Sequence, residues 1–552
     1  MRAHAAVSLV CILVSACGGG EGPPECGSLA GTIHALIPGP GEAGYDAELE
    51  RLARQYDRQF HAVNAFATAL GSDVFVARSS AANRARIERF LREGTGFDFE
   101  AETGTTAAAV VTEFQKSAGA FAGAALAGDA FRYGVLRDRG DACEDVETAR
   151  AQLVRGLESL HRAFEITGAH GVVARSLVNG NLAFGGAGEI VPLFDDQGRA
   201  LPLEKNNGTW RADASGRSPG WIWEDSASRD MVIGWALGLG SAWEVIETDE
   251  TIPEALKVSL RADALAFGQE LRKVRPSGYD LEIIDADGRT TFHGYLNENT
   301  LDRAYIDVPE NGFVSAMALG TVSVMVQVSG DAELRRWLID ELAGTRDLDG
   351  IAARSMVIID LGVVANFSNY NMAFTGTHLA LRYIDDGAAE IQLRAALRDQ
   401  LYAVPGRDRQ PSEMKQSFFD FVMAAGMAGS TRKQLPAYSI DDAAIARGLE
   451  TLREFPEPPY WETLRANCDE QELASSQCTL DDGTPVTLLG DVGRGDKLIA
   501  ASPIPMRVRP PSNFHWRSNP YEPNGGGDTG RLLPGSDFRM AYWLGRWIRR
   551  SE

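Results

Sequence analysis

Hydrophobic positions recur every three or four residues along most of this chain. The apolar positions between Asp46 and Leu70 share one helical face, and the stretch 145–167 repeats the pattern. This spacing predicts amphipathic helices. At 251–254, the run Thr-Ile-Pro-Glu has the form of a capping box with proline in the first turn, so a helix is expected to follow it. Further helices are expected near 313–328, 332–343, 353–383, 387–402, 412–427 and 441–454.

The expected helices are of two alternating kinds. Residues 231–246, 313–328 and much of 356–383 are apolar on every side, and each of these stretches is followed by an amphipathic one. A helix that is apolar all round has to be covered all round. Inner helices that alternate with half-exposed outer ones predict a mostly α fold, an α/α toroid built as a ring of helical hairpins. A solenoid is the weaker alternative, because no repeat of fixed length is present.

Two small β-hairpins are expected as insertions in this helical fold. In 279–295, strand-like runs flank the turn signal Asp287-Gly288, and 479–489 has a similar pattern. The run from Asp285 to Gly288 could also begin a calcium loop, but the other ligands of that motif are missing. We therefore expect a turn here, and no metal site.

The N-terminus has the pattern of a secretory signal. A basic start at Arg2 precedes an apolar stretch, residues 5–14, which is too short to span a bilayer. The segment 13–17, Leu-Val-Ser-Ala-Cys, resembles the lipobox of bacterial lipoproteins, which implies a mature chain that begins at a lipidated Cys17. Gly18 resembles the class sorted to the outer membrane, so a lipid anchor there is expected. An ordinary signal peptide or an N-terminal membrane helix is the alternative.

These patterns divide the chain into three parts. Residues 1–16 are expected to be the signal peptide, 17–44 a glycine-rich flexible tether, and 45–552 the toroid domain.

Six cysteines occur, of which Cys11 leaves with the signal and Cys17 carries the lipid. The remaining even number suits disulfides in an oxidising compartment. A short polar loop suggests the pair Cys468–Cys478, which leaves Cys26–Cys143 as the second pair. Four cysteines allow three connectivities in all. A zinc site is the lesser alternative, because no C-x-x-C or H-x-x-x-H accompanies them.

Charge and missing motifs narrow the function. The net charge of −22 argues against a nucleic-acid partner, which calls for a basic face. The chain has no G-x-S-x-G of serine hydrolases, no H-E-x-x-H of zincins, and no P-loop or dinucleotide fingerprint. With only eight histidines, a multi-histidine metal site is not expected, nor is any cofactor.

The most suggestive tract for chemistry is 221–235, WIWEDSASRDMVIGW. Trp223, Asp225, Arg229 and Asp230 stand just before an apolar helix. Two carboxylates beside indoles suit acid/base work on a sugar, because aromatic faces fit the apolar face of a pyranose. The structural alternative is that these acids cap the helix and favour its dipole.

Four other tracts place polar or aromatic side chains near helix ends or on a hairpin tip, where sites are often built. The tract 513–543 is interpreted as a C-terminal mouth loop, with a packed tail as the alternative. The candidates for substrate binding in these tracts are Arg175, His293, Asn369, Tyr370, His515 and Trp516. Because the inner-helix ends of a toroid meet at one mouth, we expect one shared pocket for Arg175, Trp223, Asp225, Arg229, Asp230, His293 and Asn369.

Several short motifs occur in a fixed order and support a family resemblance. They are TG-x-x-G-x-x-AR (167–175), W-x-D-S-x-S-x-D-x-x-x-G (223–234, with one extra residue in its acidic run), D-x-DG-x-x-T-x-x-G (285–294), N-x-S-x-x-x-M-x-F (366–374) and YW-x-GR (542–546). In this order they resemble a family of secreted bacterial six-hairpin, α/α toroid proteins. The architecture is more loosely similar to toroid glycoside hydrolases and polysaccharide lyases. That resemblance implies a carbohydrate substrate.

Three functions remain open. As a glycoside hydrolase, the protein would use Asp225 and Asp230 as acid and base. As a polysaccharide lyase, it would use Tyr370 or a histidine as base, with Arg175 and Asn369 neutralising a uronate. As a glycan- or protein-binding lipoprotein it would catalyse nothing, and the carboxylates would only cap the helix. Candidates that converge on one face favour a site, whereas scattered ones favour capping.

Overall fold

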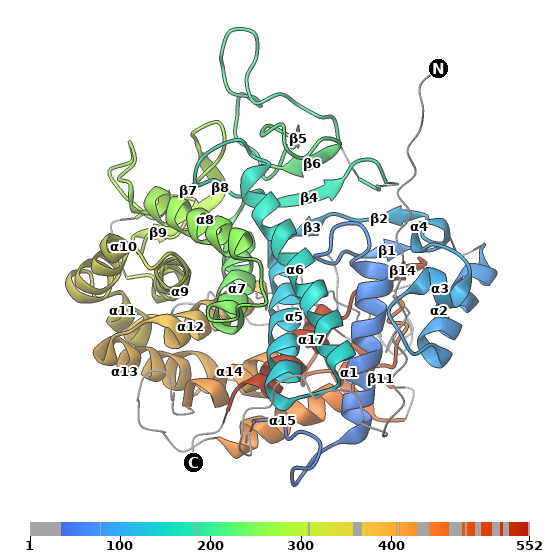
Figure 1. Cartoon of the computed structure of the whole chain (residues 1–552). Coiled ribbons are helices and arrows are strands. Elements are labelled where there is room, and N and C mark those ends of the chain that lie inside the picture. The colour runs from blue at the N-terminus through green and yellow to red at the C-terminus, as the bar shows by residue number, and fades with distance from the viewer. Residues whose placement is uncertain are drawn as a thin grey trace, which may run out of the picture.

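The computed structural model describes residues 35–77, 79–182, 184–186, 188–306, 310–356, 367–404, 406–407, 409–427, 441–462, 477–480, 483–491, 498–509, 519–522 and 529–549. In this part the protein is mostly α-helical, with a few small antiparallel sheets (Figure 1). The predictions for Cys17, Cys26, Cys468, His515 and Trp516 fall outside the described residues and stay predictions.

Six helices of the described chain pack in a cyclic order. They are α5 (Gly119–Arg139), α7 (Arg229–Ile246), α9 (Gly312–Ser329), α12 (Phe367–Tyr383), α14 (Ser417–Met427) and α17 (Ser536–Trp547). Each packs against the next in this list, and α17 packs back against α5 (Figure 1). We call them the inner helices. Most of their residues are buried, as the apolar stretches 231–246 and 313–328 predict.

Contacts along the inner helices show that neighbours run in the same direction. Residue numbers rise together in the contacting pairs Gly119–Met231 and Gly123–Gly238 of α5 and α7, Gly128–Met540 and Gly134–Trp547 of α5 and α17, Arg229–Phe313 and Gly240–Val324 of α7 and α9, and Phe374–Phe419 and Leu381–Gly426 of α12 and α14. Near the C-terminus of α7, Glu244 accepts hydrogen bonds from Tyr383 of α12 (3.0 Å) and Trp547 of α17 (2.9 Å). These bonds hold the C-terminal ends of the three helices together. Their N-termini therefore lie together at the opposite end.

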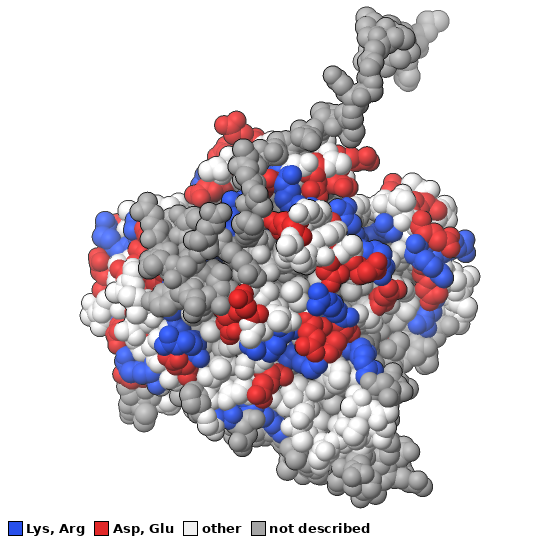
Figure 2. All heavy atoms as spheres, turned by 90° about the horizontal axis from the view of Figure 1, so that it is seen from below, with Lys and Arg blue, Asp and Glu red and all other residues white. Residues whose placement is uncertain are grey.

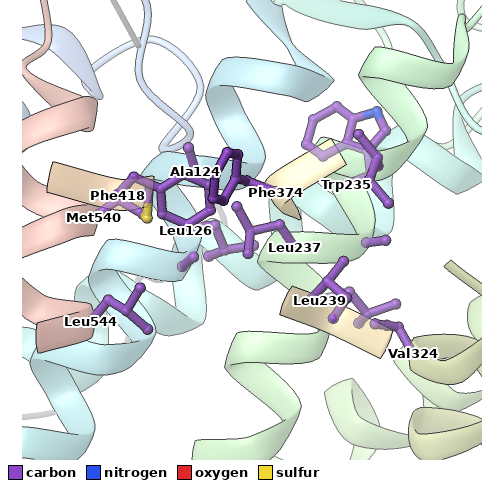
Figure 3. Close-up of a cluster of buried hydrophobic side chains, with 14 of the residues drawn as sticks. Ala124, Leu126, Trp235, Leu237, Leu239, Val324, Phe374, Phe418, Met540 and Leu544 are labelled. Carbon is purple, nitrogen blue, oxygen red and sulfur yellow. The ribbon is translucent and has the colours of Figure 1, made fainter. Parts of the chain in front are cut away.

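The space between the inner helices is filled by side chains. Figure 3 shows one buried cluster to which all six contribute: Ala124, Leu126, Trp235, Leu237, Leu239, Val324, Phe374, Phe418, Met540 and Leu544. Close packing of this kind leaves no open channel at this level. An accessible site on the helix axis would have to lie above the cluster, at the N-terminal ends.

Outer helices cover the inner ones. α6 packs on α5, α8 on α9 and α15 on α14. The outer elements are α1 (Ala47–Gln59) with the π-helix η1 (Phe60–Asn64), α6 (Cys143–Glu165), α8 (Glu254–Arg272), α10 (Ala332–Arg336) with η2 (Trp337–Thr345), α11 (Leu348–Arg354), α13 (Gly387–Ala395) with η4 (Ala396–Tyr402), and α15 (Asp442–Arg453). Short helices elsewhere are α2 (Ala81–Glu93), α3 (Phe99–Thr103), α4 (Ala107–Val110), η5 (Pro411–Glu413) and η6 (Met506–Val508).

Strands lie next to the N-termini of α5 and α7, along the upper edge of Figure 1. One sheet has the order β3 (Ser117–Ala118), β4 (Ser176–Asn179), β6 (Trp221–Glu224) and β5 (Trp210–Ala212), and the hairpin pairs β7 (Glu282–Ile284) with β8 (Thr290–Tyr295). The remaining strands are β1 (Val74–Phe75), β2 (Glu113–Phe114), β14 (Arg531–Leu532), β9 (Thr300–Leu301), β10 (Ala304–Tyr305), β11 (Gln477–Thr479), β12 (Pro485–Asp491) and β13 (Leu498–Ala500).

Some predicted elements are confirmed and others are wrong. Both expected hairpins pair antiparallel, as β7–β8 and β11–β12. The mouth-loop interpretation is wrong over Ser536–Trp547, which forms the inner helix α17. The capping box is also wrong: α8 begins at Glu254, and the Thr251 hydroxyl donates instead to Asp249 (2.6 Å).

Three further observations concern the predicted disulfides, a possible membrane span and the surface charge. Cys143 and Cys478 are both disulfide-bonded, while the partners expected for them lie outside the described residues, so the pairings stay predictions. Among the described helices, α9 is long and apolar enough to cross a membrane, yet 83% of it is buried inside the protein. Figure 2 shows acidic and basic residues interleaved over one face.

Candidate functional site

Asp225 lies at the end of β6, buried in an ion cluster. Only 1% of the residue is exposed. Arg211 donates to its Oδ2 from Nη2 (2.6 Å) and Nε (3.1 Å), and the Thr209 amide donates to its Oδ1 (2.8 Å). Both carboxylate oxygens are thus engaged. The prediction of Asp225 as a catalytic acid or base is wrong, because a buried carboxylate held by a buried arginine is not open to a substrate.

Lys205 extends this ion cluster to the β7–β8 hairpin. Its Nζ contacts Asp285 and lies 3.4 Å from both Asp225 and Asp287. Burial, and secondarily the charge of Asp225, raises the pKa of Asp285 above its ordinary value. The acid whose pKa is raised by the charge of Asp225 is therefore Asp285, whereas the sequence analysis paired Asp225 with Asp230.

The turn at Ser226 connects the same cluster to the hairpin backbone. Ser226 has a left-handed φ of 61°, which is costly for a residue other than glycine. Its amide donates to Asp285 (2.7 Å), and its Oγ accepts from the Phe292 amide (3.0 Å). The hairpin tip is thereby fixed beside the start of α7, which positions His293.

Trp223 is a structural residue. The residue has 0% exposure, and its indole donates from Nε1 to the Ala212 carbonyl across the sheet (2.9 Å). The expectation that it forms an exposed stacking face for a sugar is wrong. On β6 the side chain points into the core instead.

Asp230 stands in the first turn of α7 and is linked to Arg175. The Ser228 hydroxyl donates to Asp230 Oδ1, and Arg175 Nη1 donates to Ser228 Oγ (2.8 Å) and to the Ser226 carbonyl (3.1 Å). Both Asp230 and Arg175 are half-buried. Of the predicted residues, the structure therefore brings together Arg175 and Asp230, through a serine that the sequence reading did not single out.

Arg229 and His293 are brought together by Asp302. His293 Nδ1 lies 3.1 Å from Asp302 Oδ1, and Arg229 Nη2 lies 3.9 Å from the same oxygen. The Arg229 side chain is only 14% exposed, and burial lowers its pKa. Its guanidinium lies 5.7 Å from the ring of Phe313 in α9. A cation that is partly removed from water and only loosely paired favours an added anion.

Glu224 adds a carboxylate to this side of the site. It contacts Lys116 (2.5 Å), accepts from the Ser176 hydroxyl (2.8 Å) and lies 3.8 Å from Arg175 Nε. The alternation of β6 turns it away from Trp223. Sequence reasoning missed Glu224 because its partners, which lie at the starts of β3 and β4, are remote in the chain.

The α12 candidates lie in the first turn of that inner helix. Tyr370 is buried, with its ring stacked on Phe367 at 6.1 Å between centroids. It is therefore not the exposed phenol that the lyase hypothesis requires, and that assignment is wrong. Asn369 is half-buried, and among the described residues no hydrogen bond connects it to the α7 candidates.

Asp537 is an acid that the sequence analysis did not select. It lies in the first turn of α17 and is completely buried, and its Oδ2 has no hydrogen-bond partner among the described residues. Burial raises its pKa to about 7. The only sequence signal is an acid in a helical first turn, which ordinarily indicates capping.

The polar groups at the start of α7 thus form two linked sets, Arg175–Ser228–Asp230 and Arg229–Asp302–His293. We call them together the α7 cluster. Within the described ranges no group of three or more histidine, cysteine or acidic side chains is arranged to hold a metal ion. No family model, curated protein or solved structure matches the chain, so the chemistry rests on this geometry.

Proposed function

We propose that the protein is a carbohydrate-active enzyme of the α/α toroid class that binds an acidic glycan at the α7 cluster. The cyclic packing of the parallel inner helices supports the toroid assignment. The observation that carries the proposal is Arg229, a partly desolvated guanidinium whose ion pair with Asp302 is as long as 3.9 Å. The carboxylate of a uronate could accept two parallel hydrogen bonds from the Arg229 guanidinium.

Proton abstraction beside that carboxylate is the reaction that the cluster supports best. Arg229 would neutralise the carboxylate, which makes the neighbouring C–H more acidic. His293, oriented through Nδ1 by Asp302 (3.1 Å), would take the proton at Nε2. The C–H bond and the bond to the glycosidic oxygen break, a C=C bond forms, and the departing oxygen takes a proton from solvent. The protein would thus be a polysaccharide lyase.

Glycoside hydrolysis is the second candidate. The observation that favours it is Asp230, whose half-buried carboxylate has one described side-chain partner, Ser228. Asp230 would be one of the two acids and Asp302 the other. Without turnover, the same cluster would make a glycan-binding protein.

One assay separates these possibilities. The protein is incubated with neutral and uronate-containing polysaccharides, and unsaturated products and new reducing ends are measured together. A lyase yields both signals and a hydrolase yields reducing ends alone. Arg229→Gln should abolish the lyase signal, whereas the surface variant Arg335→Gln, whose side chain is 55% exposed, should retain it. Activity that survives Arg229→Gln would reject the proposal.

We also propose that the protein is lipid-anchored at Cys17 in a bacterial outer membrane. The support is the sequence pattern 13–18 alone. Cys17→Ser should release the protein from the membrane fraction or leave it unprocessed. Unchanged fractionation would overturn the anchor without affecting the proposed reaction.

A further inference from the structure

A cavity lies on the outer wall, away from the α7 cluster. Its volume is about 480 Å³, within the range of small-molecule sites. The end of α6, the loop 168–172, the segment 214–217 and the middle of α8 line it. None of the residues in the Arg175–Ser228–Asp230 or Arg229–Asp302–His293 sets belongs to its lining.

Two ion pairs face this cavity. His161 Nδ1 lies 2.7 Å from Asp263 Oδ2, and Arg217 Nη1 donates to Glu165 Oε1 at 2.7 Å. His161 Nε2 is 3.9 Å from the same Glu165 oxygen. Cations and anions therefore balance within the wall. A charged ligand would have to compete with one of these pairs, whereas a neutral ligand would not.

Each pair leaves hydrogen-bonding capacity unused. Among the described residues, Asp263 Oδ1 and Glu165 Oε2 accept no side-chain hydrogen bond, and His161 Nε2 has no close partner. The hydrogen bond to Asp263 raises the pKa of His161, and burial raises the pKa of Asp263. The guanidinium of Arg217 supplies N–H donors to the same wall. The wall thus offers acceptors beside a donor. A hydroxyl group suits this arrangement because it donates and accepts at once.

The rest of the wall is mostly apolar, with His170 and Ser215 as further polar residues. Gly168 and Gly171 have φ of 65° and 68°, and a Cβ on either would lie within 2.7 Å of a backbone oxygen. These glycines let the loop close against Ala214 and Ala266. Phe164 and Val172 add apolar surface. A ligand with both C–H faces and hydroxyl groups matches this lining.

We propose that this cavity binds a neutral sugar through the His161–Asp263 and Glu165–Arg217 pairs. The loop 168–172 leads directly into Arg175, so the cavity and the α7 cluster share one stretch of chain. In the context of the proposed function, the cavity is a secondary site for a neutral unit of the glycan. The binding itself does not depend on turnover, since every group involved belongs to the cavity.

Binding is tested by calorimetry and ligand-observed NMR on the full-length Arg229→Gln protein, in which the uronate site proposed at the α7 cluster lacks its cation. The probes are methyl glucopyranoside, methyl glucuronopyranoside, glucosamine and a neutral glucan oligosaccharide. The neutral glycoside should bind, and at least tenfold more tightly than either charged sugar. Asp263→Asn should weaken its binding at least tenfold. If the oligosaccharide binds tenfold more tightly than the methyl glycoside, the ligand is a glycan chain. If the two bind with equal affinity, the ligand is a free sugar.

Controls separate this cavity from the candidate site and from folding defects. Added to the Arg229→Gln protein, Asp230→Asn, in the α7 cluster, and Arg272→Gln, on α8 outside the cavity, should both leave the binding of the neutral glycoside unchanged. Ala262→Phe fills the cavity without removing a charge and should also abolish binding, with an unchanged melting temperature. The proposal is overturned if no sugar binds, if a charged sugar binds best, or if Ala262→Phe retains full affinity. None of these outcomes bears on the lyase assay.

Discussion

Asp225 and Asp230 lie five residues apart in one tract and have opposite surroundings. Asp225 is buried, with both oxygens engaged by Arg211 and Thr209. Asp230 is half-buried and takes one described side-chain hydrogen bond, from Ser228. The difference comes from the segment 205–211, which supplies two cations to one acid and none to the other. Carboxylate spacing alone therefore does not identify an open pair.

The two environments have complementary uses. The ion cluster of Lys205, Arg211, Asp225 and Asp285 fastens the hairpin to the start of α7. The α7 cluster is built on that support, since His293 stands on the fastened hairpin. If this division is right, substitutions in the ion cluster change the stability, and substitutions in the α7 cluster change the activity.

The largest expected effect is that of Asp225→Asn. It leaves the buried guanidinium of Arg211 without its partner, and breaking a buried ion pair costs about 3–5 kcal/mol. Chemical denaturation should show this loss in the free energy of unfolding. A loss below about 1 kcal/mol would mean that Asp225 is not the structural acid of the comparison.

Asp230→Asn should give the reverse result. For the hydrolase candidate, in which Asp230 is one of the two acids, the expected loss of activity is at least about 100-fold, or about 2.7 kcal/mol of transition-state stabilisation. Its free energy of unfolding should stay within about 0.5 kcal/mol of the wild type, as for substitutions near the surface. Ser228→Ala is the matched variant, which keeps the carboxylate but removes its hydrogen bond. If both variants are fully active, Asp230 only caps the helix.

The sequence predicts most of the inner helices, but it does not predict α5 and α17. The inner helices α7 and α9 match the apolar stretches 231–246 and 313–328 within two residues at each end. α5 lacks a clear apolar period because glycines contact α7 and α17 backbone along it. α17 buries charges, such as Arg539 against Asp57 (2.7 Å), that periodicity analysis assigns to solvent.

The sequence predicted which candidate residues lie near one another better than it predicted the surroundings of each. Arg175, Asp230, Arg229 and His293 do lie in linked sets near the start of α7. Of the residues that link them, Ser228 belongs to the motif at 223–234 but was not selected as a candidate, and Asp302 lies in none of the tracts. The countercharges that neutralise Asp225 come from a loop with no recognisable pattern, and burial of Trp223 depends on strand pairing that short apolar runs do not specify.

Asp285→Asn tests how much a second acid of the ion cluster contributes to the stability, compared with Asp225. We expect a loss of about 2 kcal/mol, because Lys205 retains Asp225 and Asp287 as partners. The pKa of Asp285 is raised in the folded protein, so the wild type loses stability as the pH rises above about 4. The variant lacks this titration. The difference in unfolding free energy between the wild type and Asp285→Asn should therefore become smaller from pH 4 to pH 7. A difference that becomes larger would contradict the raised pKa of Asp285.

The smallest expected effect is that of Trp223→Phe. Phenylalanine keeps most of the buried apolar surface but leaves the Ala212 carbonyl without the indole donor, a loss of about 1 kcal/mol. Because Trp223 is completely buried beneath the sheet, glycan affinity and turnover should not change. Thermal unfolding and the polysaccharide assay measure the two properties separately. If the variant keeps the wild-type stability but binds glycan more weakly, Trp223 is a glycan-binding residue after all, and the sheet opens when the substrate binds.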